Sequence, residues 1–208
     1  MSQFFSLHPD NPQPRLIRET VKILRAGGVM VYPTDSCYAL GCLIGNKEGM
    51  ERIRAIRRVD DKHHFTLVCR DLSEIAHYAR VDNKQYRLLK TATPGGFTFI
   101  LEATREVPRR LQHPKRSSIG LRVPDHPLVA ALLAELDEPI LSMTLQLAGD
   151  DYPLNDPEDI QEHLGGLVDV ILESGYCGIE PTSVVDLSAG APELIRRGTG
   201  DVGRLGLE

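Results

Sequence analysis

The 208-residue sequence contains no tryptophan, and aromatic residues make up only 5% of it. Proteins that hold single-stranded nucleic acid stack its bases on aromatic side chains, so this scarcity argues against that mode of binding. No apolar run approaches the roughly 20 residues that a transmembrane helix requires, and we expect no membrane partner. Residues 1–15 also lack the basic and apolar regions of a secretory signal.

Cysteine is scarce as well. The four cysteines Cys37, Cys42, Cys69 and Cys177 form no CxxC pair and show no zinc-like spacing. This pattern is more typical of a reduced, cytoplasmic protein than of a disulfide framework. We interpret Cys37 and Cys42 as packed thiols rather than nucleophiles.

Positive charge is missing from much of the second half. Residues 125–193 contain 15 Asp and Glu and no Lys or Arg, whereas residues 52–116 contain 15 Lys and Arg and 7 Asp and Glu, a net charge of +8. Basic segments bind phosphates or RNA if they converge in space; otherwise they are solvated helix faces. We predict that the acidic half faces away from one positive surface, which is formed by Arg58, Lys62, Arg110, Lys115 and Arg122.

The common catalytic motifs are absent. The chain has no GxxxxGK[ST] phosphate loop, no GxGxxG, no GxSxG, no HExxH and no kinase signature. The adjacent His63 and His64 would leave a helix or strand in different directions, so exposed polar residues are the better interpretation than a shared metal site. We therefore assign no metal ligands and no catalytic nucleophile.

Helix and strand patterns alternate along the chain. Periodicity predicts helices over residues 14–28, 47–58, 71–79, 126–137 and 156–165, the third with Asp71 or Ser73 as its N-cap. Strands are predicted over residues 29–32, 65–69, 97–103, 118–124, 140–144, 169–174, 183–187 and 193–198. This interleaving predicts an α/β or mixed α+β layer fold, and several short connections favour a mixed sheet. No linker-like segment divides the chain, so we predict a single domain over residues 1–208.

Three segments rich in hydroxyl groups adjoin apolar strands: YPTDS at residues 32–36, SMTLQLAG at 142–149 and PTSVVD at 181–186. Each alone fits an ordinary turn or cap. Together with the arginine-bearing segments GLRVP and IRRG, they predict one polar pocket. Hydroxyl and backbone N–H groups orient an amino acid or nucleotide, and arginine neutralises a carboxylate or phosphate.

The ordered set YPTDSCYALGC, PGGFTFIL, IGLRVPDHPL, ILSMTLQLAG and PTSVVDL…IRRG resembles the YrdC-like family of threonylcarbamoyl-adenylate synthases, and most closely its YciO branch. The match covers about residues 15–200 and leaves 1–14 as an N-terminal extension. The resemblance implies a twisted, largely mixed sheet flanked by helices, with a large concave basic cavity. It also implies ATP or AMP and L-threonine, or a similar small acid, as ligands, with bicarbonate as co-substrate in a reaction that serves tRNA modification. Mg²⁺ is expected if the synthase reaction is retained, and no tightly bound cofactor is expected.

The resemblance assigns roles to individual residues. Binding of a threonine-like substrate falls to Thr34, Arg122, Ser142, Thr182 and Ser183. Binding of the nucleotide falls to Arg58, Lys62, Ser118, Thr144 and Arg196.

Two family motifs are altered in this chain. Ile56 replaces the first lysine of a Lys-x-Arg motif, and Thr144 and Gln146 replace the Ser and Asn of a Ser-x-Asn motif. Loss of a cation near a triphosphate implies weak or retuned synthase activity. Alternatively, Ile56 simply completes a helix face with Met50 and Ile53. A second function class stays open, in which the basic face binds double-stranded RNA, tRNA or rRNA by shape and phosphate contacts without chemistry.

Overall fold

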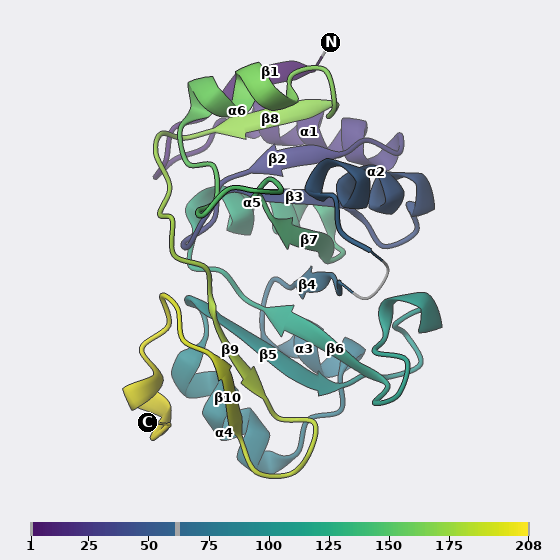
Figure 1. Ribbon diagram of the computed structural model, residues 1–208, viewed down its shortest axis with the longest axis vertical. Helices are drawn as coiled ribbons and strands as arrows, with labels where there is room; N and C mark the ends of the chain where they lie inside the picture. The colour runs from purple at the N-terminus through teal and green to yellow at the C-terminus, as the bar shows by residue number, and fades with distance from the viewer. Residues whose placement is uncertain (1, 61–62, 208) are drawn as a thin grey trace.

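A computed structural model describes residues 2–60 and 63–207, and its strands form one ten-stranded sheet in the order β1-β8-β2-β3-β7-β4-β6-β5-β9-β10. In Figure 1 the strands follow one another from β1 at the top to β10 at the bottom, and the two termini lie at opposite ends. The strands are β1 (Gln3–Ser6), β2 (Met30–Tyr32), β3 (Ala39–Leu43), β4 (Thr66–Val68), β5 (Phe97–Glu102), β6 (Ser118–Arg122), β7 (Ile140–Thr144), β8 (Val170–Glu173), β9 (Ser183–Asp186) and β10 (Glu193–Arg196).

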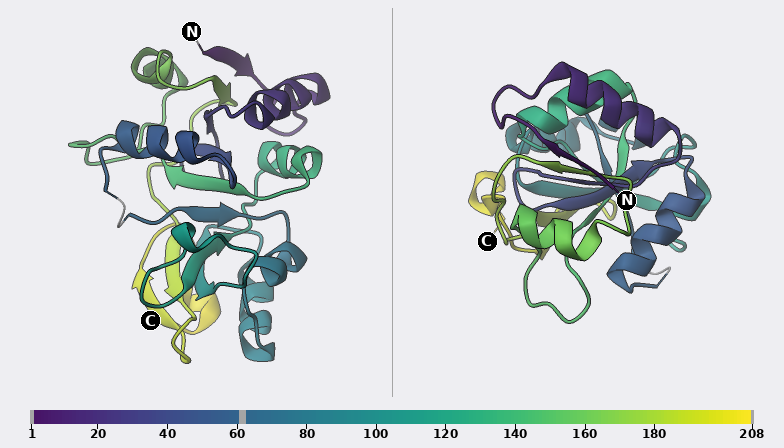
Figure 2. Two further views of the ribbon diagram at one scale, coloured as in Figure 1. Left: turned by 90° about the vertical axis from the view of Figure 1, so that its right-hand side faces the viewer. Right: turned by 90° about the horizontal axis from the view of Figure 1, so that it is seen from above.

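Helices lie on both faces of the sheet. They are α1 (Pro14–Arg25), α2 (Lys47–Arg57), α3 (Leu72–Tyr78), α4 (Asn83–Ala92), α5 (Pro127–Leu136) and α6 (Pro157–Leu164), with short 3₁₀ helices η1 (Arg109–Leu111) and η2 (Val202–Leu205). Figure 2 shows α1 and α5 on one side of the strands and α2 and α6 on the other. No helix of the described residues is long and apolar enough to cross a bilayer.

The predicted fold class is confirmed, since the sheet mixes parallel and antiparallel pairs. Strand β8 runs parallel to both β1 and β2, whereas β3 runs antiparallel to both β2 and β7. Residues 33–38 alone connect β2 to β3, and so short a connection joins only antiparallel neighbours.

Two apolar clusters hold the layers together. One lies under α1 and α5 and includes Ile17, Val21 and Leu24, which recur at helical spacing on the buried face of α1. The other covers the opposite face and extends to β5 and β6. Of the two residues predicted as the N-cap of α3, Asp71 and Ser73, Asp71 is the N-cap: its side chain accepts a hydrogen bond from the backbone N–H of Glu74 at 2.9 Å.

Strands β1 and β3, helix α4 and the 3₁₀ helices η1 and η2 were not predicted. Strand β3 is almost entirely buried and contains Gly41, so it lacks the alternating pattern of a half-buried strand. Helix α4 begins with a capping box between Asp82 and Gln85, a local sequence signal for a helix start that was not used, because the prediction relied on apolar periodicity. Strand β1 lies within the N-terminal extension and adds an edge strand to the sheet.

Candidate ligand-binding site

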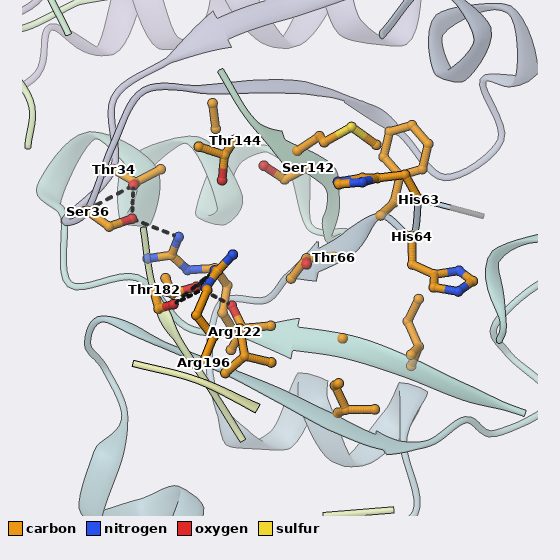
Figure 3. A pocket seen from close by; sticks show the side chains of 18 of the residues that line it. Thr34, Ser36, His63, His64, Thr66, Arg122, Ser142, Thr144, Thr182 and Arg196 are labelled. Carbon is orange, nitrogen blue, oxygen red and sulfur yellow. Dashed lines mark hydrogen bonds between the residues drawn. The ribbon is translucent and has the colours of Figure 1, made fainter. Parts of the chain in front are cut away.

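A row of small and polar residues crosses the middle of the sheet. The register places Ser142 of β7 beside Thr66 of β4, and Thr66 beside Gly120 of β6. Gly120 in turn lies beside Ile100 of β5, and Ile100 beside Asp186 of β9. Because Gly120 has no side chain, the sheet face is hollow here. A cavity of about 250 Å³ lies over this row (Figure 3).

The three hydroxyl-rich segments predicted to share a pocket all reach this cavity. The loop after β2, the strand β7 and the segment before β9 each supply hydroxyl side chains to its wall. Its hydroxyl groups come from Thr34, Ser36, Tyr38, Thr66, Thr98, Ser118, Ser142, Thr144 and Thr182, and its guanidinium groups from Arg116, Arg122 and Arg196.

Thr34 organises the loop between β2 and β3. Its hydroxyl donates to the carbonyl of Cys37 at 2.7 Å and accepts from the backbone N–H groups of Ser36 and Cys37 at 3.2 and 3.3 Å. These local bonds replace backbone pairing in a short turn. The loop that follows the buried strand is therefore fixed, with Thr34 and Ser36 facing the cavity.

Arg122 is held by a buried ion pair at the end of β6. Its guanidinium donates to the Asp35 carboxylate and, at 3.2 Å, to the Ser36 hydroxyl. The second Asp35 oxygen accepts from the backbone N–H of Asp125 at 2.9 Å. The side chains of Arg122 and Asp35 are 10% and 12% exposed, and the Arg122 Nε has no partner within the described chain. The pair fixes the Arg122 guanidinium in the cavity wall.

Arg196 approaches the same end of the cavity from β10. Its Nε and Nη2 donate to the Thr182 carbonyl at 3.1 and 2.9 Å, and burial lowers the pKa of its guanidinium. The Thr182 hydroxyl lies 2.8 Å from that of Thr98 on β5. Ser183, by contrast, is fully buried and donates to the Gly200 carbonyl at 2.7 Å; it does not line the cavity.

Ser142 completes a buried hydroxyl pair below the cavity. The Tyr32 hydroxyl donates to Ser142 Oγ at 2.7 Å, and Ser142 donates to the Leu40 carbonyl at 3.3 Å. Burial raises the pKa of Tyr32 to about 12, so the phenol stays protonated at neutral pH and remains a donor.

Replacing Ser142 by alanine should destabilise the protein through Tyr32. Ser142→Ala leaves the buried Tyr32 hydroxyl without its acceptor, which costs about 1–3 kcal/mol of unfolding free energy. Tyr32→Phe added to Ser142→Ala should recover part of this loss, because both polar partners are then absent. Urea denaturation of the three variants measures the effect. A double variant less stable than Ser142→Ala alone would show that the pair is not the cause.

Comparison with known proteins now decides the family. The family model described as telomere recombination, which covers Sua5, YciO and YrdC proteins, matches residues 22–198. The chain belongs to this Sua5/YciO/YrdC family. The resemblance stated from the sequence is thereby confirmed.

The chain is similar to YciO proteins over nearly its whole length and, at lower identity, to a threonylcarbamoyl-AMP synthase. The chain is 55% identical over 202 residues to Escherichia coli K12 "uncharacterized protein YciO", covering 97% of this chain and 98% of that protein. The crystal structure of E. coli YciO matches with a TM-score of 0.94 over 98% and 99% of the two chains. A threonylcarbamoyl-AMP synthase of Coxiella burnetii is 31% identical over 185 residues, or 86% of this chain and 96% of that protein.

The fold extends to a more distant member that contains a bound amino acid. The crystal structure of Pyrococcus abyssi Sua5 complexed with L-threonine matches with a TM-score of 0.86, 20% identity, and coverage of 95% of this chain and 58% of that one. At this identity the likeness shows the shared fold.

The nucleotide-binding residues transferred from the family lie in different places. Ser118, Thr144 and Arg196 line the cavity. Arg58 does not: it is the exposed C-cap of α2, with a left-handed φ of 50°. Lys62 lies outside the described residues.

Of the three altered family positions, Thr144 lines the cavity, whereas Ile56 and Gln146 do not. Ile56 packs, partly buried, against the core on the side of α2 that buries Met50 and Ile53. Gln146 donates to the Asp150 carbonyl at 2.9 Å, away from the cavity wall. The geometry favours the helix-face interpretation of Ile56.

Three histidines line the cavity that the family motifs did not identify. His63 and His64 precede β4, and His113 faces them from the loop before β6, with the His64 and His113 ring centroids 5.1 Å apart. Burial is the main cause that lowers the pKa of both His63 and His64. Both are exposed as predicted, yet they lie at the cavity (Figure 3). The sequence does show that His63 and His64 directly precede a buried strand, and this position could have predicted that they lie at the cavity.

The prediction that the acidic half faces away from the basic half is wrong. Strands and helices of the two halves alternate across one sheet, so their side chains meet. Arg116 pairs at 3.0 Å with Asp186, whose side chain is 2% exposed. Further pairs between the two segments are Arg52 with Asp169 at 2.8 Å and Arg70 with Asp137 at 2.9 Å.

The cysteines offer no activated nucleophile. All four thiols are free, and burial raises the pKa of Cys37 to about 11 and that of Cys42 to about 12. Thiols this basic are protonated at neutral pH. Across residues 2–60 and 63–207, no group of three or more His, Cys, Asp and Glu is arranged to hold a metal ion.

Proposed function

We propose that this protein binds a nucleotide and L-threonine, or a similar small amino acid, in the cavity and forms threonylcarbamoyl-AMP or a related acyl adenylate at a low rate. The observation that carries this proposal is the wall itself: hydroxyl groups from three strand ends and three guanidinium groups face one hollow of the sheet. The name of the C. burnetii relative and the threonine bound by P. abyssi Sua5 support the choice of substrate.

The residues suit recognition of a small zwitterion. Arg122 lines the cavity beside the Ser36 hydroxyl, so its guanidinium can donate to a carboxylate. Thr182 and Ser36 lie beside the two arginines at the same end and offer hydroxyl groups to the amine and side-chain hydroxyl.

The reaction needs no protein nucleophile. The threonine amine combines with bicarbonate to give a carbamate and water; a carbamate oxygen then bonds to the α-phosphorus of ATP, and pyrophosphate leaves. Charge that develops on the phosphoryl oxygens is stabilised by fixed cations. The cavity supplies guanidinium groups for this role, which agrees with its protonated thiols.

Magnesium fits this site poorly as a resident metal. Asp186 is the carboxylate that lines the described cavity, and it is occupied by Arg116 at 3.0 Å and by the Ser188 hydroxyl at 2.6 Å. We therefore expect any Mg²⁺ to be bound through the nucleotide phosphates, as is usual for this ion.

Duplex RNA is a weaker candidate than a small ligand. Arg52 and Arg70 of the basic segment pair with Asp169 and Asp137 of the acidic segment. Arg122, one of the residues predicted to form a positive surface, instead pairs with Asp35 in the cavity wall. Arg110, another of them, donates to the Ile44 carbonyl at 3.0 Å.

A direct assay tests the proposed reaction. Purified protein with ATP, L-threonine, bicarbonate and Mg²⁺ should release pyrophosphate above a protein-free blank, and release should require both threonine and bicarbonate. Chromatography should show threonylcarbamoyl-AMP in the same mixture. Absence of release, together with calorimetry that detects no binding of ATP or threonine, would reject the proposal.

A further inference from the structure

We propose that His126 is a positioning residue for Arg122 of the cavity wall. Its neutral imidazole caps α5 and fixes the loop that holds Asp35 against Arg122, and protonation of the imidazole in acid releases that loop. The role rests on the proposed function in that Arg122 binds the carboxylate of the ligand.

Three histidines of the chain precede a proline and cap a turn in the same way. They are His8, His113 and His126, and in each the imidazole Nδ1 accepts the backbone N–H of the residue two positions later, at 3.2, 3.3 and 3.2 Å. Because Nδ1 is the acceptor, the proton of the neutral ring lies on Nε2. Protonation at Nδ1 removes the acceptor, so each turn depends on a neutral ring.

His126 is the N-cap of α5. Its Nδ1 accepts the N–H of Leu128, and Pro127, the first helical residue, has no N–H to satisfy. The N-terminus of a helix carries partial positive charge, which disfavours an imidazolium at this position. While His126 is neutral, the start of α5 is fixed together with the backbone that enters it from β6.

The backbone that enters α5 supports the ion pair of the cavity wall. Asp125, directly before His126, donates its N–H to Asp35 at 2.9 Å, and the other Asp35 oxygen accepts from Arg122. Arg122 also donates to Ser36 Oγ at 3.2 Å. The short β6–α5 connection is therefore fixed at one end by the ion pair and at the other by the cap. Loss of the cap lets the Asp125 N–H leave Asp35, and the guanidinium is then held less firmly.

Burial and two carboxylates set the protonation of His126. Burial lowers the pKa of its imidazole, and Asp35 and Asp125 oppose this effect without reversing it. Arg70 and Asp71, at the start of α3, line a second hollow of about 350 Å³ together with the partly exposed His126, so water reaches the ring. Since the folded pKa lies below the ordinary 6.5, the neutral cap stabilises fully above about pH 6.5 and is lost as the pH falls through the folded pKa.

Two substitutions separate capping from protonation. Asparagine at position 126 keeps a capping oxygen and does not titrate, whereas alanine removes the cap. His8 provides a matched control, because it makes the same kind of turn at an exposed place outside the cavity wall.

The first measurement is long-range ¹H–¹⁵N NMR of the imidazole nitrogens of the full chain, together with amide hydrogen exchange. At pH 7.5 His126 should carry a proton on Nε2 and none on Nδ1. The Asp125 amide should be protected in the parent and in His126→Asn, and its protection should fall about fivefold in His126→Ala, the change expected for one lost N-cap. His8→Ala should leave the Asp125 amide as it is in the parent.

The second measurement is pH dependence. From pH 7.5 to pH 5.5, protection of the Asp125 amide, corrected for the intrinsic exchange rate, should fall in the parent and stay nearly constant in His126→Asn. The Kd for L-threonine, measured by calorimetry, should follow, so that the ratio of the parent Kd to the His126→Asn Kd rises about threefold or more on acidification. The same ligand is used at each pH, so its own titration cancels in the ratio.

Several results would overturn the role of His126. A proton on Nδ1 at pH 7.5, or parent-like protection of the Asp125 amide in His126→Ala, would remove it. So would a His126→Asn variant whose affinity falls in acid as steeply as that of the parent. A lowered Tm in His126→Ala with an unchanged threonine Kd would confine His126 to helix stability. The proposed function fails separately: it is rejected if the parent does not bind L-threonine at pH 7.5, and the NMR measurements then still decide whether His126 holds the loop.

Discussion

Gly120→Val is expected to abolish ligand binding while the sheet stays folded. A Cβ at Gly120 would lie 3.3 Å from Thr66 Oγ1 and 3.4 Å from Thr98 Cγ2, so the first carbon fits tightly and requires only a small shift of these two side chains. Side chains in a strand stand perpendicular to the sheet, and the remaining valine atoms must enter the cavity. The affinity for threonine and ATP should fall more than about a hundredfold, which corresponds to about 2.8 kcal/mol.

Gly120→Ala is the matched control for this change. Its methyl group stays near contact distance of Thr66 and Thr98, so binding should fall by much less than in Gly120→Val. Calorimetry measures the affinities, and circular dichroism with thermal unfolding checks the fold. If Gly120→Val is folded and binds both ligands as the parent does, the cavity over Gly120 is not the binding site.

The role of Gly120 in forming the hollow of the sheet could not be predicted from the sequence. The three hydroxyl-rich segments were visible because each adjoins an apolar strand, which is a local pattern. The hollow itself depends on strand register, which places Thr66, Gly120 and Ser142 in one row from three separate segments. A glycine inside a strand pattern is ambiguous until its neighbours across the sheet are known. Register is a non-local property, so the floor of the cavity could not be predicted.

The periodicity of α2 predicts which of its residues lie on the buried side, and Arg57 could have been placed there from the sequence. The buried positions Met50 and Ile53 define the inward side of α2, and Arg57 continues that side by one turn. The motif match drew attention to Arg58 instead, which becomes the left-handed C-cap. Charge patterning failed for a different reason: the separation of acidic and basic residues along the chain does not survive when their strands interleave in one sheet.

Among single substitutions at the site, removal of either partner of the Asp35–Arg122 pair should cause the largest loss of unfolding free energy. Both side chains are largely buried, at 12% and 10% exposure. Arg122→Gln leaves the Asp35 carboxylate with the Asp125 N–H and without its cation, and such an uncompensated charge costs about 3–5 kcal/mol. Since a typical domain is stable by about 5–15 kcal/mol, the variant should unfold at much lower urea concentration. Threonine binding should be lost as well, because the guanidinium faces the cavity.

A double-mutant cycle separates loss of the pair from loss of each side chain. Asp35→Asn with Arg122→Gln removes both charges while keeping groups able to hydrogen-bond to Ser36 and to the Asp125 N–H. If the ion pair is the cause, the double variant should be more stable than Arg122→Gln alone, with a coupling energy of at least about 1 kcal/mol. Urea midpoints at constant m-value measure each corner of the cycle. Strictly additive losses would mean that the two side chains stabilise the protein independently. Threonine binding should stay absent in the double variant even where its stability recovers, because restoring the fold does not restore the guanidinium.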